Sequence, residues 1–257
     1  STFTETGYYE LDGNMNLKKE DDPEMADFIR EKFAIPRNVV TIDEASVLIH
    51  DDLGRRWRLP VVNRAFIDLT DASALRLCRE VVTERDLFNC AGTFYELPAN
   101  NADGFAKIRP LASHNFRIHD YASYRGMLII SGINPETAKQ NSQIIISSDG
   151  NAAVWAGVID DLWKMGKPVG EGGPWKNSEV TAGVPSDPYL IGFYDKKSLE
   201  LSHNSSGTIT FTIEAEPIGH GPWMNYMTVK VKPGEVYKYD FNQAFESRWI
   251  RFVADQN

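Results

Sequence analysis

The alternation of apolar and polar residues predicts short β-strands along most of the chain. Residues 208–214 and 227–231 alternate cleanly, which is typical of half-buried antiparallel strands. Clusters of Gly, Pro, Asn and Asp separate the apolar runs and mark turns. The predicted strands cover residues 46–50, 56–59, 75–82, 92–97, 127–132, 144–147, 153–158, 190–194, 199–202, 208–215, 224–231, 235–241 and 249–253.

One stretch, residues 21–33, has the period of a helix. Asp22 is a candidate N-cap, and Pro23 stands at the first helical position, where its missing N–H costs nothing. The apolar positions that share one face of this helix are Met25, Phe28, Ile29 and Phe33. The sequence therefore predicts an all-β protein with one N-terminal helix.

Short strands at close spacing are typical of a sandwich, a barrel or a propeller. Two predicted hairpins, residues 47–59 and 144–157, each join an apolar strand to a second strand that carries Trp57 or Trp155. In the first, Asp52, Gly54 and Trp57 have the spacing D-x-G-x-x-W, which resembles the Asp-box hairpin of sialidase-like β-propellers. An ordinary Asp-Gly hairpin is the alternative.

We therefore predict propeller-like antiparallel sheets, forming a complete or partial propeller. Residues 1–193 form the propeller-like region, with the helix at 21–33 as an insertion. Residues 194–257 form a C-terminal β meander, either the last blade or a small sandwich-like module.

Composition narrows the choice of partner. The net charge is −9 and no block of Lys and Arg is present, which argues against a nucleic-acid partner. No apolar run approaches the length of a membrane span. Aromatic residues, 11% of the chain, include groups able to stack on sugar rings, so a small polar ligand fits better. Two cysteines, Cys78 and Cys90, exclude a disulfide scaffold but leave open one bridge or two free thiols.

The chemistry-bearing groups concentrate in residues 113–126. In an extended chain, Arg117, His119 and Tyr121 share one face. A guanidinium that holds a carboxylate, with an imidazole and a phenol to move protons, suits β-elimination on a uronic acid. The alternative is a set of buried, satisfied structural side chains. The candidate catalytic residues are His119, Arg117, Tyr121, His114 and Arg125, and the candidate substrate-binding residues are Trp163, Trp175, Tyr124 and Asp120.

A glycoside hydrolase is the rival enzyme, because it needs two carboxylates at a suitable separation. The candidate pairs are Asp160 with Asp161, and Glu84 with Asp86. No metal site or cofactor is predicted, although calcium at the turn residues Asp51, Asp52 and Asp149 stays open. The isolated His50, His203 and His220 are interpreted as structural or surface residues.

Several segments resemble the C-terminal part of large, uncharacterised secreted β-propeller proteins of Bacteroidetes-type bacteria that are linked to polysaccharide use. These segments are RRWRLP, CREVVTERDLFNCAGTFYELPANNADGFAKIRP, SHNFRIHDYASYRGMLIISG and WKMGKPVGEGGPWKN. The resemblance covers most of residues 53–253, and the propeller rhamnose-glucuronate lyases and related glycosidases are more loosely similar. No catalytic residue of those enzymes is carried over. The resemblance implies a secreted or periplasmic protein, with a companion segment completing the propeller.

Together these observations predict a carbohydrate-active protein that cleaves a uronate-containing polysaccharide or oligosaccharide as a hydrolase or a lyase. The alternative is a non-catalytic glycan-binding or structural module of a secreted assembly. In that alternative, Trp163, Trp175 and Trp223 make the ligand contacts.

Overall fold

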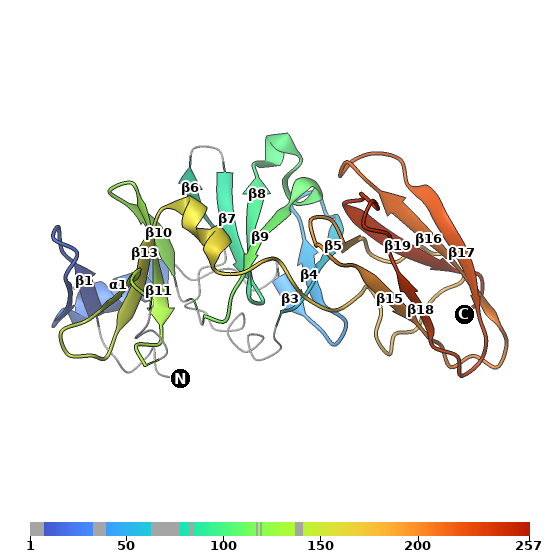
Figure 1. Cartoon of the computed structure of the whole chain (residues 1–257), viewed down its shortest axis with the longest axis horizontal. Coiled ribbons are helices and arrows are strands. Elements are labelled where there is room, and N and C mark those ends of the chain that lie inside the picture. The colour runs from blue at the N-terminus through green and yellow to red at the C-terminus, as the bar shows by residue number, and fades with distance from the viewer. Residues whose placement is uncertain are drawn as a thin grey trace. The chain divides into compact units, whose positions relative to one another are not determined.

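The computed structural model describes residues 8–32, 40–62, 78–82, 85–116, 118, 120–136 and 141–257, with side chains for all of these except residues 29–32, 78–82 and 85. This part of the chain is all-β, as predicted, with several antiparallel sheets and little helix (Figure 1). The described residues divide between two compact units. Unit 1 comprises Ser1–Arg37, Asn63–Glu96 and Leu111–Lys167, and unit 2 comprises Asn38–Val62, Leu97–Pro110 and Pro168–Asn257.

Unit 1 contains a hairpin, a helix and strands of two four-stranded sheets. The hairpin joins β1 (Tyr8–Leu11) to β2 (Leu17–Glu20), and α1 (Pro23–Lys32) follows. One sheet has the order β10 (Tyr121–Tyr124), β11 (Met127–Ile133), β13 (Ala153–Gly157), β12 (Ile144–Ile146). The other has the order β6 (Cys78–Val82), β7 (Arg85–Cys90), β8 (Thr93–Pro98), β9 (Arg109–Ser113). The last two residues of β8 and the first two of β9 are assigned to unit 2. The 3-10 helix η4 (Ile159–Lys164) follows β13.

The core of unit 1 gathers the apolar positions of these strands. Leu128, Ile130 and Ile133 of β11 are buried, and Trp155 of β13 is 1% exposed. Their spacing changes between Ile130 and Ile133 because the pairing of β11 with β13 shifts after Ser131. Such a bulge places one extra residue in a strand, which re-aims the side chains beyond it.

The helix begins as predicted. The Asp22 Oδ1 accepts the backbone N–H of Met25 at 2.9 Å, which caps the first turn before Pro23. The predicted apolar face is only partly covered, because Met25 is 40% exposed and Phe28 is 51% exposed. The predicted last residue, Phe33, lies outside the described residues.

Unit 2 is built on a seven-stranded sheet. Its order is β17 (Met224–Val231), β16 (Ile209–Glu216), β19 (Trp249–Ala254), β14 (Tyr189–Leu190), β5 (Arg56–Leu59), β4 (Val47–His50), β3 (Val40–Ile42). The pairs are antiparallel except for the single parallel contact between β14 and β5. A second sheet pairs β15 (Ser198–Leu201) with β18 (Tyr237–Asp240). The short 3-10 helices η2 (Asn100–Ala102) and η3 (Gly104–Lys107) belong to this unit too.

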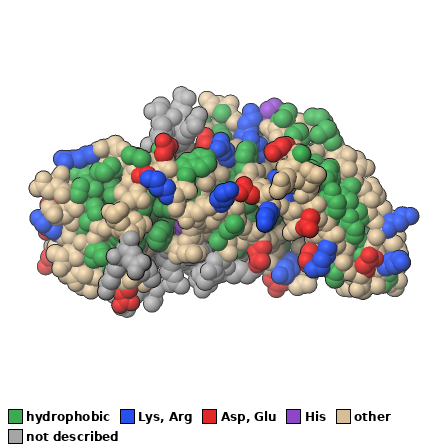
Figure 2. Space-filling view, viewed as in Figure 1, with side chains coloured by type: hydrophobic (Ala, Val, Ile, Leu, Met, Phe, Trp, Pro, Cys, Tyr) green, Lys and Arg blue, Asp and Glu red, His purple; other side chains and the backbone are tan. Residues whose placement is uncertain are grey.

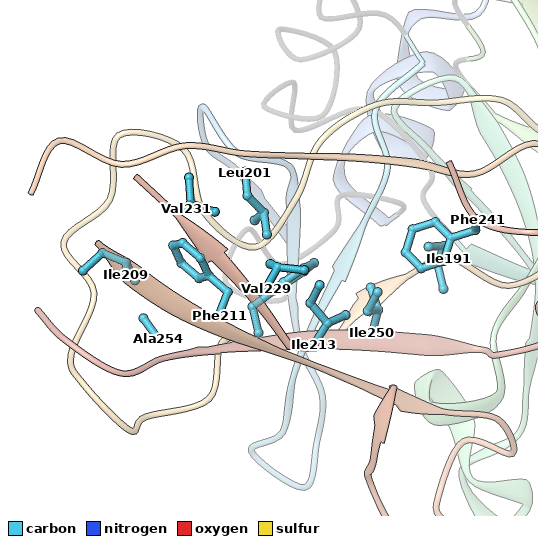
Figure 3. Close-up of a cluster of buried hydrophobic side chains, with 11 residues drawn as sticks. Ile191, Leu201, Ile209, Phe211, Ile213, Val229, Val231, Phe241, Ile250 and Ala254 are labelled. Carbon is cyan, nitrogen blue, oxygen red and sulfur yellow. The ribbon is translucent and has the colours of Figure 1, made fainter. Parts of the chain in front are cut away.

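The principal core of unit 2 lies between its two sheets. Figure 3 shows Phe211 and Ile213 of β16 beside Val229 of β17, with Ile250 of β19 next to them. Leu201 of β15 and Phe241, which follows β18, join the same buried cluster. Inward side chains alternate along β16, where Ile209, Phe211, Ile213 and Ala215 are buried. This arrangement has the two layers of a β-sandwich.

The first tryptophan hairpin forms between β4 and β5, but its turn depends on a different aspartate from the one the spacing indicated. Asp51 Oδ2 accepts the indole N–H of Trp57 at 2.8 Å, and Asp51 Oδ1 accepts the backbone N–H groups of Leu53 and Arg55. Gly54 has a φ of 73° and completes the turn. Asp52, which the sequence pattern indicated, instead accepts a hydrogen bond from Asn100.

The second hairpin lies in unit 1, between β12 and β13. Asp149 Oδ1 accepts the backbone N–H of Asn151 at 3.1 Å and the hydroxyl of Ser147. Gly150 takes a φ of 74°, and Trp155 packs in the core. Both hairpins therefore use an aspartate to hold the turn and a tryptophan to anchor it.

Candidate functional site

The described residues of the predicted mid-chain cluster are largely hydrogen-bonded within unit 1. His114 is 5% exposed, its Nε2 lies 2.8 Å from Asn89 Oδ1, and its Nδ1 accepts the backbone N–H of Phe116. Because Nδ1 accepts, Nε2 carries the proton and donates to Asn89. Burial lowers the pKa of His114 to about 4, so its imidazole is neutral near pH 7 and both nitrogens are engaged.

Tyr121 is also a core residue. It is 2% exposed, its hydroxyl donates to the Leu87 carbonyl, and its ring meets Phe94 edge-on at 5.7 Å. Arg117 and His119 lie outside the described residues. Tyr121 is the first residue of β10, and the face that it was predicted to share with Arg117 and His119 stays a prediction.

The remaining residues of the cluster support the turn between β10 and β11. Arg125 occupies that turn at a φ of 51°, donates to the Gly13 carbonyl at 2.8 Å and lies 5.4 Å from the Tyr124 ring. Asp120 Oδ1 accepts the backbone N–H of Tyr121, and the Asp120 carbonyl accepts the Ser131 hydroxyl. These contacts join the β10–β11 hairpin to other residues of unit 1.

The predicted tryptophan contacts are divided between the units. Trp163, in η4 of unit 1, is 56% exposed. Trp175 packs in unit 2, with its ring 6.1 Å from Phe252 and 6.5 Å from Phe211. Trp223, also in unit 2, lies 4.3 Å from the Arg251 guanidinium, which pairs with Glu214. Trp163 is therefore the most accessible of the three.

Of the acidic pairs proposed for a hydrolase, the structure gives the surroundings of Asp161. Asp161 accepts hydrogen bonds from Lys164 Nζ, from the Val158 N–H and from Gln143. The Lys164 contact lowers the pKa of Asp161, the opposite of what a general acid requires. Of the other candidate pair, Glu84 lies outside the described residues.

No metal-ligand cluster is found among the described side chains, where no three or more His, Cys, Asp or Glu residues converge. The proposal of calcium at the turns stays a prediction. Cys90 is a free buried thiol whose pKa burial raises to about 12, so it is an unreactive core group rather than a nucleophile.

A hollow that no sequence pattern singled out lies in unit 2. Its volume is about 490 Å³, within the range of small-molecule sites, which is about 300–1,000 Å³. It lies where β16 ends and β17 begins, beside the loop that joins β18 to β19. The lining residues are Ala215, Pro217, Met224, Asn225, Tyr226, Asn242, Ala244, Phe245, Glu246 and Ser247.

A β-bulge places Tyr226 at this hollow. Ile213 pairs with Met227, while the next residue, Glu214, pairs with Asn225, so Tyr226 is the extra residue on β17. Its ring contacts Phe245 in a T-shaped arrangement at 4.6 Å and stacks on Phe241 at 5.7 Å. These contacts hold the aromatic ring at the wall of the hollow.

The Tyr226 hydroxyl is part of a phenol pair. It lies 2.9 Å from the Tyr239 hydroxyl, and this hydrogen bond raises the pKa of Tyr226 to about 12. The phenol therefore stays protonated at physiological pH and can both donate and accept a hydrogen bond.

The loop side of the hollow is held by its own hydrogen bonds. Asn242 Oδ1 accepts the Ala244 N–H at 2.8 Å, and the Asn242 carbonyl accepts the Phe245 N–H at 2.9 Å. The Ser247 hydroxyl donates to the Trp249 carbonyl at 3.0 Å. This side of the hollow is therefore formed without a ligand.

Two polar side chains of the lining remain available. Within the described part of the chain, Asn225 and Glu246 are exposed and make no side-chain hydrogen bond or ion pair. Between the lining residues Ala215 and Pro217, the buried Glu216 carboxylate accepts the backbone N–H groups of Ile218, Gly219 and Gly221, which holds the segment after Pro217 in place. The hollow thus combines an aromatic wall, fixed edges and free hydrogen-bonding groups.

Sequence reasoning missed this site because it searched for tryptophans and for residues able to transfer protons. A signal was present in β17, where apolar residues alternate at Met227, Val229 and Val231. Tyr226 directly precedes Met227 and breaks that alternation, which is the expected mark of a bulge.

Comparison with known protein families, with curated proteins and with solved structures gives no match for this chain. No helix among the described residues is long and apolar enough to cross a membrane. Figure 2 shows Lys and Arg interspersed with Asp and Glu over the described part of the visible face. The hollow at Tyr226 is therefore the feature from which a function is inferred.

Proposed function

We propose that unit 2 is a non-catalytic carbohydrate-binding module whose ligand occupies the hollow at Tyr226. The observation that carries the proposal is the aromatic wall of Tyr226 and Phe245 beside the unpartnered Asn225 and Glu246. A sugar ring offers an apolar C–H face that packs on an aromatic ring, and hydroxyls that donate to and accept from amide and carboxylate groups. The size of the hollow supports a small ligand or one end of a chain.

Binding without cleavage is favoured by the lining itself. Glu246 is the only carboxylate among the lining residues, whereas most glycoside hydrolases use two. His114 and Tyr121, predicted to move protons, are engaged within the core of unit 1. Cleavage of a uronate-containing glycan stays a prediction that depends on Arg117 and His119.

We propose the propeller-like architecture only for the sheets that resemble blades. Two sheets have four strands each, β10-β11-β13-β12 and β6-β7-β8-β9, and four strands is the size of a propeller blade. That size supports a partial propeller completed by a companion segment, and the closed arrangement itself stays a prediction.

The proposal is tested by screening the intact chain on a glycan array and measuring the affinity of the strongest ligand by titration calorimetry. Tyr226→Ala and Phe245→Ala should each weaken binding about tenfold or more, because loss of an aromatic contact of about 1.4 kcal/mol is a factor of ten. Tyr226→Phe keeps the ring and should retain most of the affinity. Trp163→Ala is the matched control in unit 1 and should bind like the wild type.

Two results would overturn the proposal. Binding that survives Tyr226→Ala but disappears in Trp163→Ala would place the site in unit 1. Release of new reducing ends or unsaturated uronates from the bound glycan would show that the protein cleaves its ligand.

A further inference from the structure

We infer that the hollow at Tyr226 selects uncharged sugars over uronates, with Glu246 as the residue that disfavours the uronate carboxylate. This inference rests on the proposed function and assigns the hollow a different ligand class from the uronate expected at residues 113–126. It is carried by the charges of the lining residues, which are all described.

The lining provides one negative charge and no positive one. Glu246 is exposed, and among the lining residues no Lys or Arg stands opposite it. Sites that recognise a carboxylate place a cation against it, most often an arginine that donates two parallel hydrogen bonds. The hollow instead presents a carboxylate of its own, which a uronate ligand would have to approach.

The arginines closest in sequence to the lining are engaged elsewhere in unit 2. Arg248 follows the lining residue Ser247, but its Nη1 donates to the carbonyls of Lys107 and Ile108, each at 2.8 Å. Arg251 pairs with Glu214 at 2.6 Å and lies over the Trp223 ring. Turning either guanidinium toward a ligand would break these contacts.

One cation does contact the loop, and it opposes the effect of Glu246. Lys197 Nζ donates to the Phe245 carbonyl at 3.3 Å, so it is tied to the backbone of a lining residue. It is outside the set of lining residues, whereas Glu246 is within it. Of these two charges, only that of Glu246 belongs to the lining that a ligand carboxylate would contact.

The neutral hydrogen-bonding groups fit hydroxyls instead. The Asn225 amide both donates and accepts, the protonated Tyr226 phenol does the same, and Glu246 accepts. Each sugar hydroxyl is a donor and an acceptor, so an uncharged sugar satisfies these groups without placing two carboxylates together. Because Glu246 is exposed, we expect the discrimination to be roughly two- to fivefold at low salt and to shrink as salt is added.

The test uses three probes: the neutral oligosaccharide with the strongest array signal, the same oligosaccharide oxidised at C6 to the uronate, and the methyl ester of that uronate. We expect the wild type to bind the uronate two- to fivefold more weakly than the neutral probe in about 20 mM salt. The methyl ester, which restores neutrality at similar bulk, should recover most of the loss. In Glu246→Gln the ratio of the two affinities should fall to about one.

Glu179→Gln provides a matched control, since it makes the same change of charge at an exposed residue outside the lining. It should keep the wild-type ratio. A uronate that binds as tightly as the neutral probe, or a ratio that Glu246→Gln leaves unchanged, would overturn the inference while the module remains a glycan binder. Absence of binding to any array sugar, or affinity that Tyr226→Ala does not reduce, would instead overturn the proposed function and this inference with it.

Discussion

His114 shows how one residue type can have a catalytic or a structural role according to its surroundings. Its ring lies 4.8 Å from Phe94 and its two nitrogens are hydrogen-bonded within unit 1. Desolvation penalises the charged imidazolium, which lowers the pKa of His114 to about 4. A group held neutral in this way links the stability of the fold to pH.

We expect the free energy of unfolding to fall as pH drops from about 6.5 toward about 4. The pKa of His114 is lower in the folded chain than in the unfolded chain, so the unfolded state takes up the proton first as pH falls. The stability that depends on neutral His114 is complete above about pH 6.5, and about 3 kcal/mol of it is lost by about pH 4. Urea unfolding at several pH values measures this slope.

The control for this prediction compares slopes rather than absolute stabilities. His114→Leu removes the titrating group, so its stability should vary less with pH over this window even if the variant is less stable throughout. An unchanged slope in His114→Leu would show that His114 is not the group responsible.

At the scale of elements, the hairpin between β4 and β5 depends on Asp51. This carboxylate accepts hydrogen bonds from the Trp57 indole, from two backbone N–H groups and from the Arg55 side chain. Burial alone would raise the pKa of Asp51, but the hydrogen bonds from Trp57 and Arg55 lower it below its usual value. The carboxylate is therefore ionised when the turn is formed.

We expect Asp51→Ala to destabilise unit 2 by about 1–3 kcal/mol, because it leaves the Trp57 indole N–H without its acceptor. Asp52→Ala is the matched control one residue along the chain. Its exposed bond to Asn100 contributes little, so its free energy of unfolding should stay within about 0.5 kcal/mol of the wild type. Equal losses in the two variants would show that the turn does not depend on Asp51 in particular.

The strands that were predicted from sequence are those with a clear period or an apolar run. β17 (Met224–Val231) and β5 (Arg56–Leu59) were predicted to the residue, because alternation and turn residues mark their ends. β10 (Tyr121–Tyr124) and β9 (Arg109–Ser113) were missed, since their polar residues hide the pattern and their pairing is set by neighbouring strands. Local sequence patterns therefore indicate where strands lie more reliably than they indicate which strands pair.

At the scale of the molecule, the all-β class follows from composition and periodicity, but the site does not. Tyr226 reaches the hollow because β17 gains one residue relative to β16. The break in alternation at Tyr226 marks an extra residue, but it does not show which residues of other strands and loops lie beside it. Asn242 and Phe245 also line the hollow. They belong to the loop between β18 and β19, which connects two different sheets. Sequence reasoning instead favoured residues 113–126, where the density of polar side chains is high but the described ones are largely engaged.

A sugar that occupies the hollow at Tyr226 is the central proposal for this protein. An NMR titration of the intact, isotope-labelled chain with the strongest array ligand tests it directly. We predict that the largest chemical-shift changes fall at Asn225, Tyr226 and Phe245, while the signals of Trp163 are unaffected. These changes should saturate as the ligand concentration rises. Shift changes that centre on Trp163 or on the residues around His114, with Tyr226 and Phe245 unmoved, would contradict it.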